Sequence, residues 1–384
     1  MMRQLQFTDC VEIVGEACQP FSGYKQYVST GAVAINHISN DDIELVDYDG
    51  KPSRANLIAK SGDILFAKMM GTKKTLHLDE DTAQNIYSTG FCAVRARPTV
   101  LTDRCLYHLL TSKAFLDQKD KNCSGATQKA ITNAGLSKIT IKVPSIGQQA
   151  SIAQQLDRIA SIIALRQSEL QKLDELIKAR FVEMFGTLEE PTHEFSWATL
   201  KELCNKITDG KHGGCTTESG TERYFVGARE IYDDKVHYET APEINAAEFE
   251  KDYKRCNVEI GDFLIVNTGA TIGKSAIASD ERTTHTLLQK SVALLKVKKD
   301  VLDPIFLKWC YRVNTGMYMV KSASAQPNLL LSKINATEIY VPDIMLQKQF
   351  TDFVKQTDKS KVVVQKALDE AQTLFDSLMQ EYFG

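Results

Sequence analysis

The sequence predicts an α+β protein: two mixed α/β domains separated by two long antiparallel helices that form an intramolecular coiled coil, arranged as a pseudo-twofold tandem repeat. Three observations support this fold class: an internal repeat, two long apolar seams with helical spacing, and short strands with loops between them. The repeat consists of matching residues that lie 198 positions apart. The matches are Val143-Pro144 with Val341-Pro342, Gln128 with Gln326, Gln149 with Gln347, and 183–186 with 381–384. Self-similarity at a fixed spacing indicates two copies of one folding unit.

The repeat divides the chain into four segments. Mixed domains are predicted at 1–144 and 187–342, and long helices at 145–186 and 343–384. Each mixed domain has a Gly-Asp turn before a buried strand, at 62–66 and 261–265, and a last strand before the helix, at 139–143 and 338–341. Between these anchors the two domains differ strongly. A shared frame with unlike loops is how two related domains would bind different ligands.

Each predicted helix carries an apolar seam in 3-4 spacing with polar residues between. A seam sustained over about four heptads indicates a coiled coil. Each helix ends in Phe-Gly, and glycine is a favourable helix terminator. One such helix alone would leave its seam in water, so we expect the two to pack on each other; the alternative is that each packs on its own domain. The seam residues are Leu156, Ile163, Leu170, Leu173, Ile177, Val354, Val364, Leu368, Phe375 and Leu378.

Composition narrows the class of protein. No apolar run approaches the roughly 18–20 residues that a membrane span needs, and no signal peptide opens the chain, so we expect a cytoplasmic protein without membrane contact. The nine cysteines include no Cys-x-x-Cys pair, which favours reduced thiols and no metal site.

The net charge of the chain is −3, with 22 Lys+Arg against 20 Asp+Glu up to residue 186 and 24 against 29 after it. Nucleic-acid binding would therefore depend on local patches.

No catalytic motif is predicted. The segment Gly269–Ser275 resembles a phosphate-binding loop, but it has three residues between its glycines where that loop needs four, and no long helix follows. A Gly-x-Gly-x-x-Gly nucleotide motif and the Asn/Asp-Pro-Pro-aromatic motif of amino methylation are both absent. We therefore expect no catalytic residues and no cofactor bound by this chain.

Polar residues that suit DNA gather on the predicted loops of both domains. Lys contacts phosphates, and Asn or Gln amides can read adenine edges. Asn267, Thr268 and Lys274 are the best placed, because they follow a buried strand that would hold them rigidly. The candidate DNA-binding residues are Lys68, Lys73, Lys74, Thr127, Gln128, Lys211, His212, Asn267, Thr268, Thr271, Lys274, Gln326 and Asn328.

The chain resembles the specificity subunits of type I restriction-modification systems. The resemblance lies in the segment 261–274, in Ala325-Gln326-Pro327-Asn328-Leu329, in Val341-Pro342, and in Gln347 and Phe350 at the start of a long helix. It covers both repeats, although Lys129 replaces the proline at 327 and no second glycine follows Gly71. Membership would imply two target recognition domains that bind double-stranded DNA, and two helices that serve as spacer and docking surface. It would also imply a non-catalytic chain that docks two methyltransferase subunits using S-adenosylmethionine, with restriction-translocase subunits using ATP and Mg in the full complex.

The predicted helix length agrees with that implication. A helix of 35 residues would be about 50 Å long, somewhat more than the 34–36 Å of one duplex turn. Two unlike readers on such a spacer predict a bipartite, asymmetric DNA site. Two alternatives remain: an interaction scaffold that never contacts DNA, which a gel shift distinguishes, and a nucleotide-binding enzyme that uses Gly269–Ser275, which ATP binding distinguishes.

Overall fold

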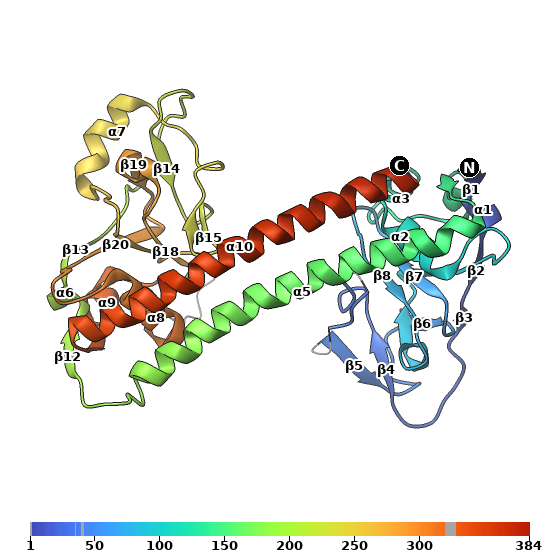
Figure 1. Cartoon of the computed structure of the whole chain (residues 1–384), viewed down its shortest axis with the longest axis horizontal. Coiled ribbons are helices and arrows are strands. Elements are labelled where there is room, and N and C mark those ends of the chain that lie inside the picture. Colours follow the sequence, from blue (N-terminus) through green and yellow to red (C-terminus); the bar gives the residue numbers. More distant parts are fainter. Residues whose placement is uncertain (1, 35, 40–41, 319–327) are drawn as a thin grey trace. The chain divides into compact units, whose positions relative to one another are not determined.

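The computed structural model describes residues 2–34, 36–39, 42–318 and 328–384, and the chain divides into two compact units. Unit 1 consists of Met1–Gln167 and Gln365–Gly384, and unit 2 consists of Ser168–Val364. Each unit therefore combines one mixed domain with parts of both long helices. Figure 1 shows these helices, green and red, as two unbroken ribbons.

The described residues of unit 1 form sheets with strand orders β1-β11, β2-β10-β7-β8 and β3-β6-β9-β4-β5. Its strands are β1 (Arg3–Gln6), β2 (Val11–Val14), β3 (Glu16–Ala17), β4 (Lys25–Val28), β5 (Ile43–Val46), β6 (Ala55–Ile58), β7 (Ile64–Ala67), β8 (Thr75–His77), β9 (Ile86–Ser88), β10 (Phe91–Ala96) and β11 (Thr140–Val143). Its shorter helices are α1 (Phe7–Cys10), η2 (Thr82–Gln84), α2 (Asp103–Thr111), α3 (Lys113–Lys121) and α4 (Asn133–Leu136).

Unit 2 contains sheets with strand orders β12-β21, β13-β20-β17-β18, β14-β19 and β15-β16. Its strands are β12 (Ser196–Thr199), β13 (Cys204–Asp209), β14 (Tyr224–Val226), β15 (Ile231–Tyr232), β16 (Lys235–Val236), β17 (Phe263–Val266), β18 (Ser275–Ile277), β19 (Thr286–Leu288), β20 (Val292–Val297) and β21 (Glu338–Val341). Its shorter helices are α6 (Leu200–Leu203), α7 (Ala246–Asp252), η3 (Tyr253–Arg255), η4 (Glu281–His285), α8 (Pro304–Val313), η5 (Thr315–Met317) and α9 (Leu331–Ala336).

The four-stranded sheet is common to the two units, as is the two-stranded sheet that pairs the first strand with the last. Its strand order is the same in both, and its central strands β7 and β17 are fully buried. The Gly-Asp anchor begins each of these strands with a buried carboxylate. Asp63 accepts hydrogen bonds from the Lys60 N–H at 2.8 Å and the Arg95 guanidinium at 2.7 Å. Asp262 accepts from the Glu259 N–H and the Lys296 ammonium, both at 2.7 Å, so the turn and its ion pair are repeated together.

The long helices are α5 (Ile146–Phe185) and α10 (Ile344–Phe383), close to the predicted bounds. In unit 1, the first turns of α5 share a core with the last turns of α10, through Ile152 and Leu156 with Met379 and Phe383. In unit 2 the opposite ends meet, through the segment 177–185 and the segment 350–354. This pattern is antiparallel. All ten predicted seam residues are buried or half-buried, and the seam also continues into the core of each mixed domain.

Polar residues that interrupt the seam have local partners. The Lys361 ammonium lies 2.6 Å from the Asp174 carboxylate on the other helix of unit 2. Thr357 donates its hydroxyl to the Phe353 carbonyl at 3.0 Å. A polar group buried without a partner would be destabilising, and these contacts remove that penalty.

A buried glutamine joins each long helix to its mixed domain. The Gln149 side chain accepts from the Thr102 N–H at 2.8 Å and donates to the carbonyls of Val100 at 2.8 Å and Pro144 at 3.0 Å. Gln347 repeats this arrangement, accepting from the Asp303 N–H at 2.9 Å and donating to the carbonyls of Val301 at 3.0 Å and Pro342 at 2.8 Å. Both glutamines are fully buried. We call each set of three hydrogen bonds a glutamine clamp.

Removing one clamp tests its role in stability. Gln347→Ala leaves one N–H and two carbonyls buried without partners, so we expect the free energy of unfolding of the protein to fall by about 3 kcal/mol. Urea denaturation followed by circular dichroism measures this change. Gln349→Ala, an exposed position two residues along the same helix, is the matched control. Equal stability of the two variants would contradict a structural role for the clamp.

Candidate nucleic-acid interface

The same loop pairing occurs in both units, next to the common sheet. Loop L1 (residues 68–74) joins β7 to β8, and loop L2 (residues 267–274) joins β17 to β18. L1 is bridged to a distant segment by Met69 and Ala130, and L2 by Thr268 and Asn328. The adjacent hydrogen bonds also correspond: the Ile131 N–H donates to the Lys68 carbonyl at 2.9 Å, and the Leu329 N–H donates to the Asn267 carbonyl at 2.7 Å. The repeat therefore preserves the pairing while its side chains differ.

In unit 2 this pairing brings predicted site residues together. Thr268 and Asn328 lie 60 positions apart, and the Thr268 hydroxyl donates to the Asn328 side-chain oxygen at 3.2 Å. Thr271 is half-buried, and its carbonyl accepts from the N–H of Lys274, whose side chain is exposed. Gly273 has φ +90°, and a Cβ there would lie 2.3 Å from the Tyr318 ring, so only glycine fits this turn. The remaining candidate on this side, Gln326, lies outside the described residues.

The position of Asn267 corrects the sequence-based expectation. Its side chain is only 4% exposed, and its Oδ1 has no hydrogen-bond partner among the described residues. A side chain that reads a base edge must reach the surface, so this position does not suit base contact. Its backbone instead holds L2 in place, donating to the Ser291 carbonyl at 3.0 Å and accepting from Leu329.

In unit 1 the candidate lysines have different surroundings. Lys73 is exposed, and Lys68 is half-buried. The Lys74 ammonium donates to the carbonyls of Thr30 at 2.6 Å and Gly31 at 2.9 Å, so it anchors a neighbouring loop. Lys73 is therefore the L1 lysine best placed for a phosphate.

The exposed residues Thr127 and Gln128 lie beside L1, because the Met70 N–H donates to the Lys129 carbonyl at 3.0 Å. The Gln128 side-chain oxygen lies 3.5 Å from the guanidinium of Arg54, which is also exposed. Gly125 has φ +136°, and a Cβ there would lie 2.4 Å from the Gln128 carbonyl. The tight turn at Gly125 therefore fixes where Thr127 and Gln128 stand.

The Lys211 side chain forms an internal ion pair. Its ammonium lies 2.5 Å from Asp252 and 3.8 Å from Glu248, and the hydrogen bond with Asp252 raises the pKa of Lys211. His212 is exposed, with its Nε2 3.6 Å from the Asp209 carboxylate. The Lys211 carbonyl accepts from the Lys290 N–H, next to the residue whose carbonyl holds Asn267. The 211–212 loop and L2 therefore share one edge of unit 2.

Sequence reasoning missed exposed cations at these edges. Lys290 is exposed between the buried strands β19 and β20. Arg229 is exposed on a turn that is held to the same segment, where the Ala228 N–H donates to the Ser291 hydroxyl at 3.2 Å. Lys290 lies two residues after the end of β19, and Arg229 lies three residues after the end of β14. A search for cations at corners between buried strands would have found Lys290. Arg54 in unit 1 carried no comparable signal.

The phosphate-loop resemblance has no structural counterpart. Gly269–Ser275 connects β17 to β18, which pair antiparallel with Phe263 opposite Ile277. A phosphate-binding loop needs the N-terminus of a helix after its strand, and here a hairpin strand follows. The nucleotide-enzyme alternative therefore loses its only motif.

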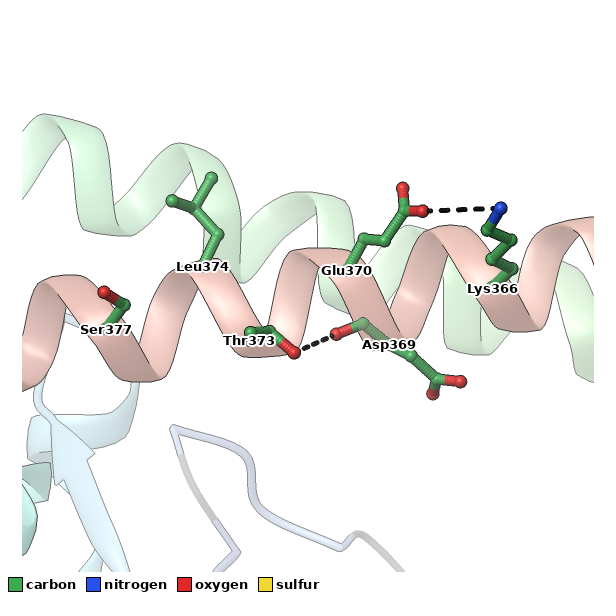
Figure 2. Close-up of a pocket in the computed structure, with 6 residues that line it drawn as sticks. All are labelled: Lys366, Asp369, Glu370, Thr373, Leu374 and Ser377. Atoms are coloured by element: carbon green, nitrogen blue, oxygen red, sulfur yellow. Dashed lines mark hydrogen bonds and ion pairs between the residues drawn. The ribbon is translucent and has the colours of Figure 1, made fainter.

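Exposed apolar side chains on the long helices also follow the repeat. Leu165 and Val363 lie 198 positions apart and are 68% and 69% exposed, and Leu176 and Leu374 are related in the same way at 49% and 51%. Leu165 and Leu374 belong to unit 1, and Leu176 and Val363 to unit 2. Figure 2 shows Leu374 on α10, where a hollow of about 520 Å³ is lined by Lys366, Asp369, Glu370, Thr373, Leu374 and Ser377. Each unit thus carries two equivalent exposed apolar positions.

Within the described part of the chain, no group of His, Cys, Asp and Glu side chains is arranged to hold a metal ion. The helices there include none with the length and apolar character of a membrane span. All nine cysteines are free, and burial raises the pKa of Cys105 and Cys204 to about 12, which keeps these thiols protonated.

Comparison with known proteins assigns the chain to a family. A family model described as the type I restriction modification DNA specificity domain matches twice, at residues 8–175 and 194–371. The specificity subunit of the type I restriction enzyme EcoBI from Escherichia coli is 21% identical over 330 residues, which cover 76% of this chain and 67% of that subunit. The EcoKI specificity subunit from Escherichia coli strain K12 is 18% identical over 377 residues, covering 91% and 79%.

Two solved structures share the fold. One is a chain from a study of complex assembly and conformational transition of the type I R-M system, with a TM-score of 0.59, 20% identity, and coverage of 99% of this chain and 97% of that one. The other is the type I restriction-modification S subunit from M. genitalium, with a TM-score of 0.57, 15% identity, and coverage of 100% and 96%. With both domains matched in order and the fold shared along its length, this chain belongs to the family of type I restriction-modification DNA specificity subunits.

Proposed function

We propose that each mixed domain is a target recognition domain that reads one half of a bipartite, asymmetric site in double-stranded DNA. The observation that carries this proposal is the repeated bridge with unlike side chains: Met69 with Ala130 in unit 1, and Thr268 with Asn328 in unit 2. An identical backbone pairing gives the two loops equivalent positions. Different side chains on them give the two domains different base preferences.

The exposed side chains at these edges divide into two chemical classes. Lys73, Lys274 and Lys290 are exposed cations suited to phosphates, which position a protein without reading sequence. Asn328 and Gln128 are exposed amides that suit base edges. The chain has a net charge of −3, so these few cations, with those of partner subunits, supply the electrostatic attraction.

The chain contributes recognition, and partner subunits contribute catalysis. In this proposal two methyltransferase subunits bind S-adenosylmethionine, and restriction-translocase subunits of the full complex use ATP and Mg. Two copies of one partner require two similar surfaces on this chain, and the exposed pairs Leu165 with Val363 and Leu176 with Leu374 meet that requirement. The Lys366–Glu370 ion pair, at 3.9 Å, lies next to Leu374 and gives that position a polar rim (Figure 2).

Exchange of one domain tests the two-reader proposal. Replacing 187–342 with the same region of a relative should change one half of the methylated sequence and leave the other half unchanged, because each domain reads only its own half. Sequencing methylated DNA from a host that carries the chimera with its partner subunits measures this. The unmodified chain gives the reference sequence. A change in both halves, or in neither, would overturn the proposal.

Point variants separate phosphate contacts from base contacts in unit 2. Lys274→Ala should weaken binding to all sequences alike and lower the slope of log affinity against log salt by about 1. Asn328→Ala should reduce discrimination at one base pair of one half-site by ~1–3 kcal/mol. Binding of the assembled complex to duplexes with single base changes measures both effects. Lys355→Ala, an exposed lysine on α10 of the same unit, is the charge-matched control. Equal effects of Lys274→Ala and Lys355→Ala would exclude L2 from the DNA surface.

Charged substitutions test the apolar docking positions one unit at a time. The double variant Leu165→Asp with Leu374→Asp should release one methyltransferase subunit and keep the other, because the equivalent positions in unit 2 are untouched. Native mass spectrometry of the co-purified complex gives the stoichiometry. Gln154→Asp, at another exposed position of unit 1, controls for the added charge. Retention of both partners would show that these leucines are not part of the docking surface.

A further inference from the structure

A buried lysine beneath loop L1 has no part in the recognition surface described above. Lys119 lies in the last turn of α3, and its side chain is 0% exposed. Its ammonium donates to the Met69 carbonyl at 2.8 Å and the Thr72 carbonyl at 3.2 Å, and it lies 2.8 Å from the Asp120 carboxylate. A lysine is almost never fully buried unless its charge is paired and its protons are bonded. Here all three acceptors are present, and two of them belong to L1.

Lys119 and Asp120 together hold both ends of one tight turn. The Thr72 hydroxyl and N–H donate to the Met69 carbonyl, which closes the turn from residue 69 to residue 72. Asp120 accepts from the Gly71 N–H at 3.1 Å, at the tip, where Gly71 has φ +76°. Lys119 thus binds the carbonyls of Met69 and Thr72, and Asp120 binds the N–H of Gly71. Lys73, the exposed lysine of L1, follows directly after this turn.

The repeat places a different type of residue at the position of Lys119 in unit 2. The residue 198 positions after Lys119 is Met317, which is buried and packs in the apolar core of unit 2. There the corresponding loop L2 is fixed by the Thr268–Asn328 hydrogen bond and by the fit of Gly273 against Tyr318. A methionine is therefore compatible with this fold position, and the lysine serves the particular loop that it contacts.

We infer that Lys119 and Asp120 are positioning residues that set the shape of L1, and through it the base preference of the half-site read by the first domain. This inference rests on the proposed function, since it assigns a specificity role to groups that do not touch DNA. Buried hydrogen-bonded groups that fix the rotamers and backbone of a contact loop determine how precisely the loop meets its target. The influence of Lys119 should therefore stop at the first domain.

The test uses Lys119→Met in the assembled complex with its methyltransferase partners. Binding and methylation are measured on duplexes that carry single base changes in either half-site, after the domain exchange has shown which half the first domain reads. We expect discrimination in that half-site to fall by about tenfold, as for the loss of one base contact, and discrimination in the other half-site to stay unchanged. Lys121→Met, an exposed lysine two residues along α3, is the matched control and should behave like the unmodified chain.

Two outcomes decide the matter. Loss of discrimination confined to the first half-site, with recovery in Lys119→Arg, supports the inference. A lower melting temperature with unchanged discrimination in both half-sites overturns it, because a merely structural lysine would behave in that way. Should Lys119→Met fail to fold, Asp120→Ala, at a partly exposed side chain that holds the same turn, decides by the same measurement. Failure of the proposed function itself is distinguished by the domain exchange. In that case, exchange of 187–342 would change both halves of the methylated sequence or neither.

Discussion

The glutamine clamp is the interaction on which the rest of each unit depends. Gln149 and Gln347 stand in the first turn of their helices, and each bonds to the Pro carbonyl before its helix and to the loop before α2 or α8. Three buried hydrogen bonds from one side chain fix the direction in which a long helix leaves its domain. Amide groups suit this task because they donate and accept at once and carry no charge to desolvate. The start of each long helix is thereby joined to its mixed domain.

The two units repeat one frame while their loops differ. The common sheet, its buried Asp63 or Asp262, and the loop bridge are repeated, whereas the groups that stabilise each loop are not. L1 is stabilised from below by a buried ion pair, and L2 by packing of Gly273 against an aromatic ring. The two loops therefore differ both in their sequences and in the groups that support them. If the inference about Lys119 and Asp120 holds, recognition specificity extends below the surface, into residues that do not touch DNA.

The fold was largely predictable from the sequence, and the site only in part. The apolar seam from Leu156 to Ile177 has helical spacing, so the presence of α5 and the pairing of the helices could be predicted from local pattern. Whether a loop side chain is exposed or bonded within the protein depends instead on residues that are distant in the sequence. Lys74 bonds to Thr30, 44 residues away, and Lys211 to Asp252, 41 residues away. The burial of Asn267 likewise arises from packing that no local pattern encodes. Residue types alone indicated which loops could form a DNA-binding surface. Tertiary contacts determine which of their side chains are exposed there.

The division of the chain into units has a consequence for its synthesis. Unit 2 is one continuous stretch, Ser168–Val364, whereas the core of unit 1 contains Phe7 from one end of the chain together with Met379 and Phe383 from the other. A ribosome delivers the N-terminus first, so unit 1 begins to form early yet stays open on the face that α10 will cover. Unit 2 can complete its core beforehand. The helical turns that carry Met379 and Phe383 then cover apolar residues of unit 1 that were exposed until that point.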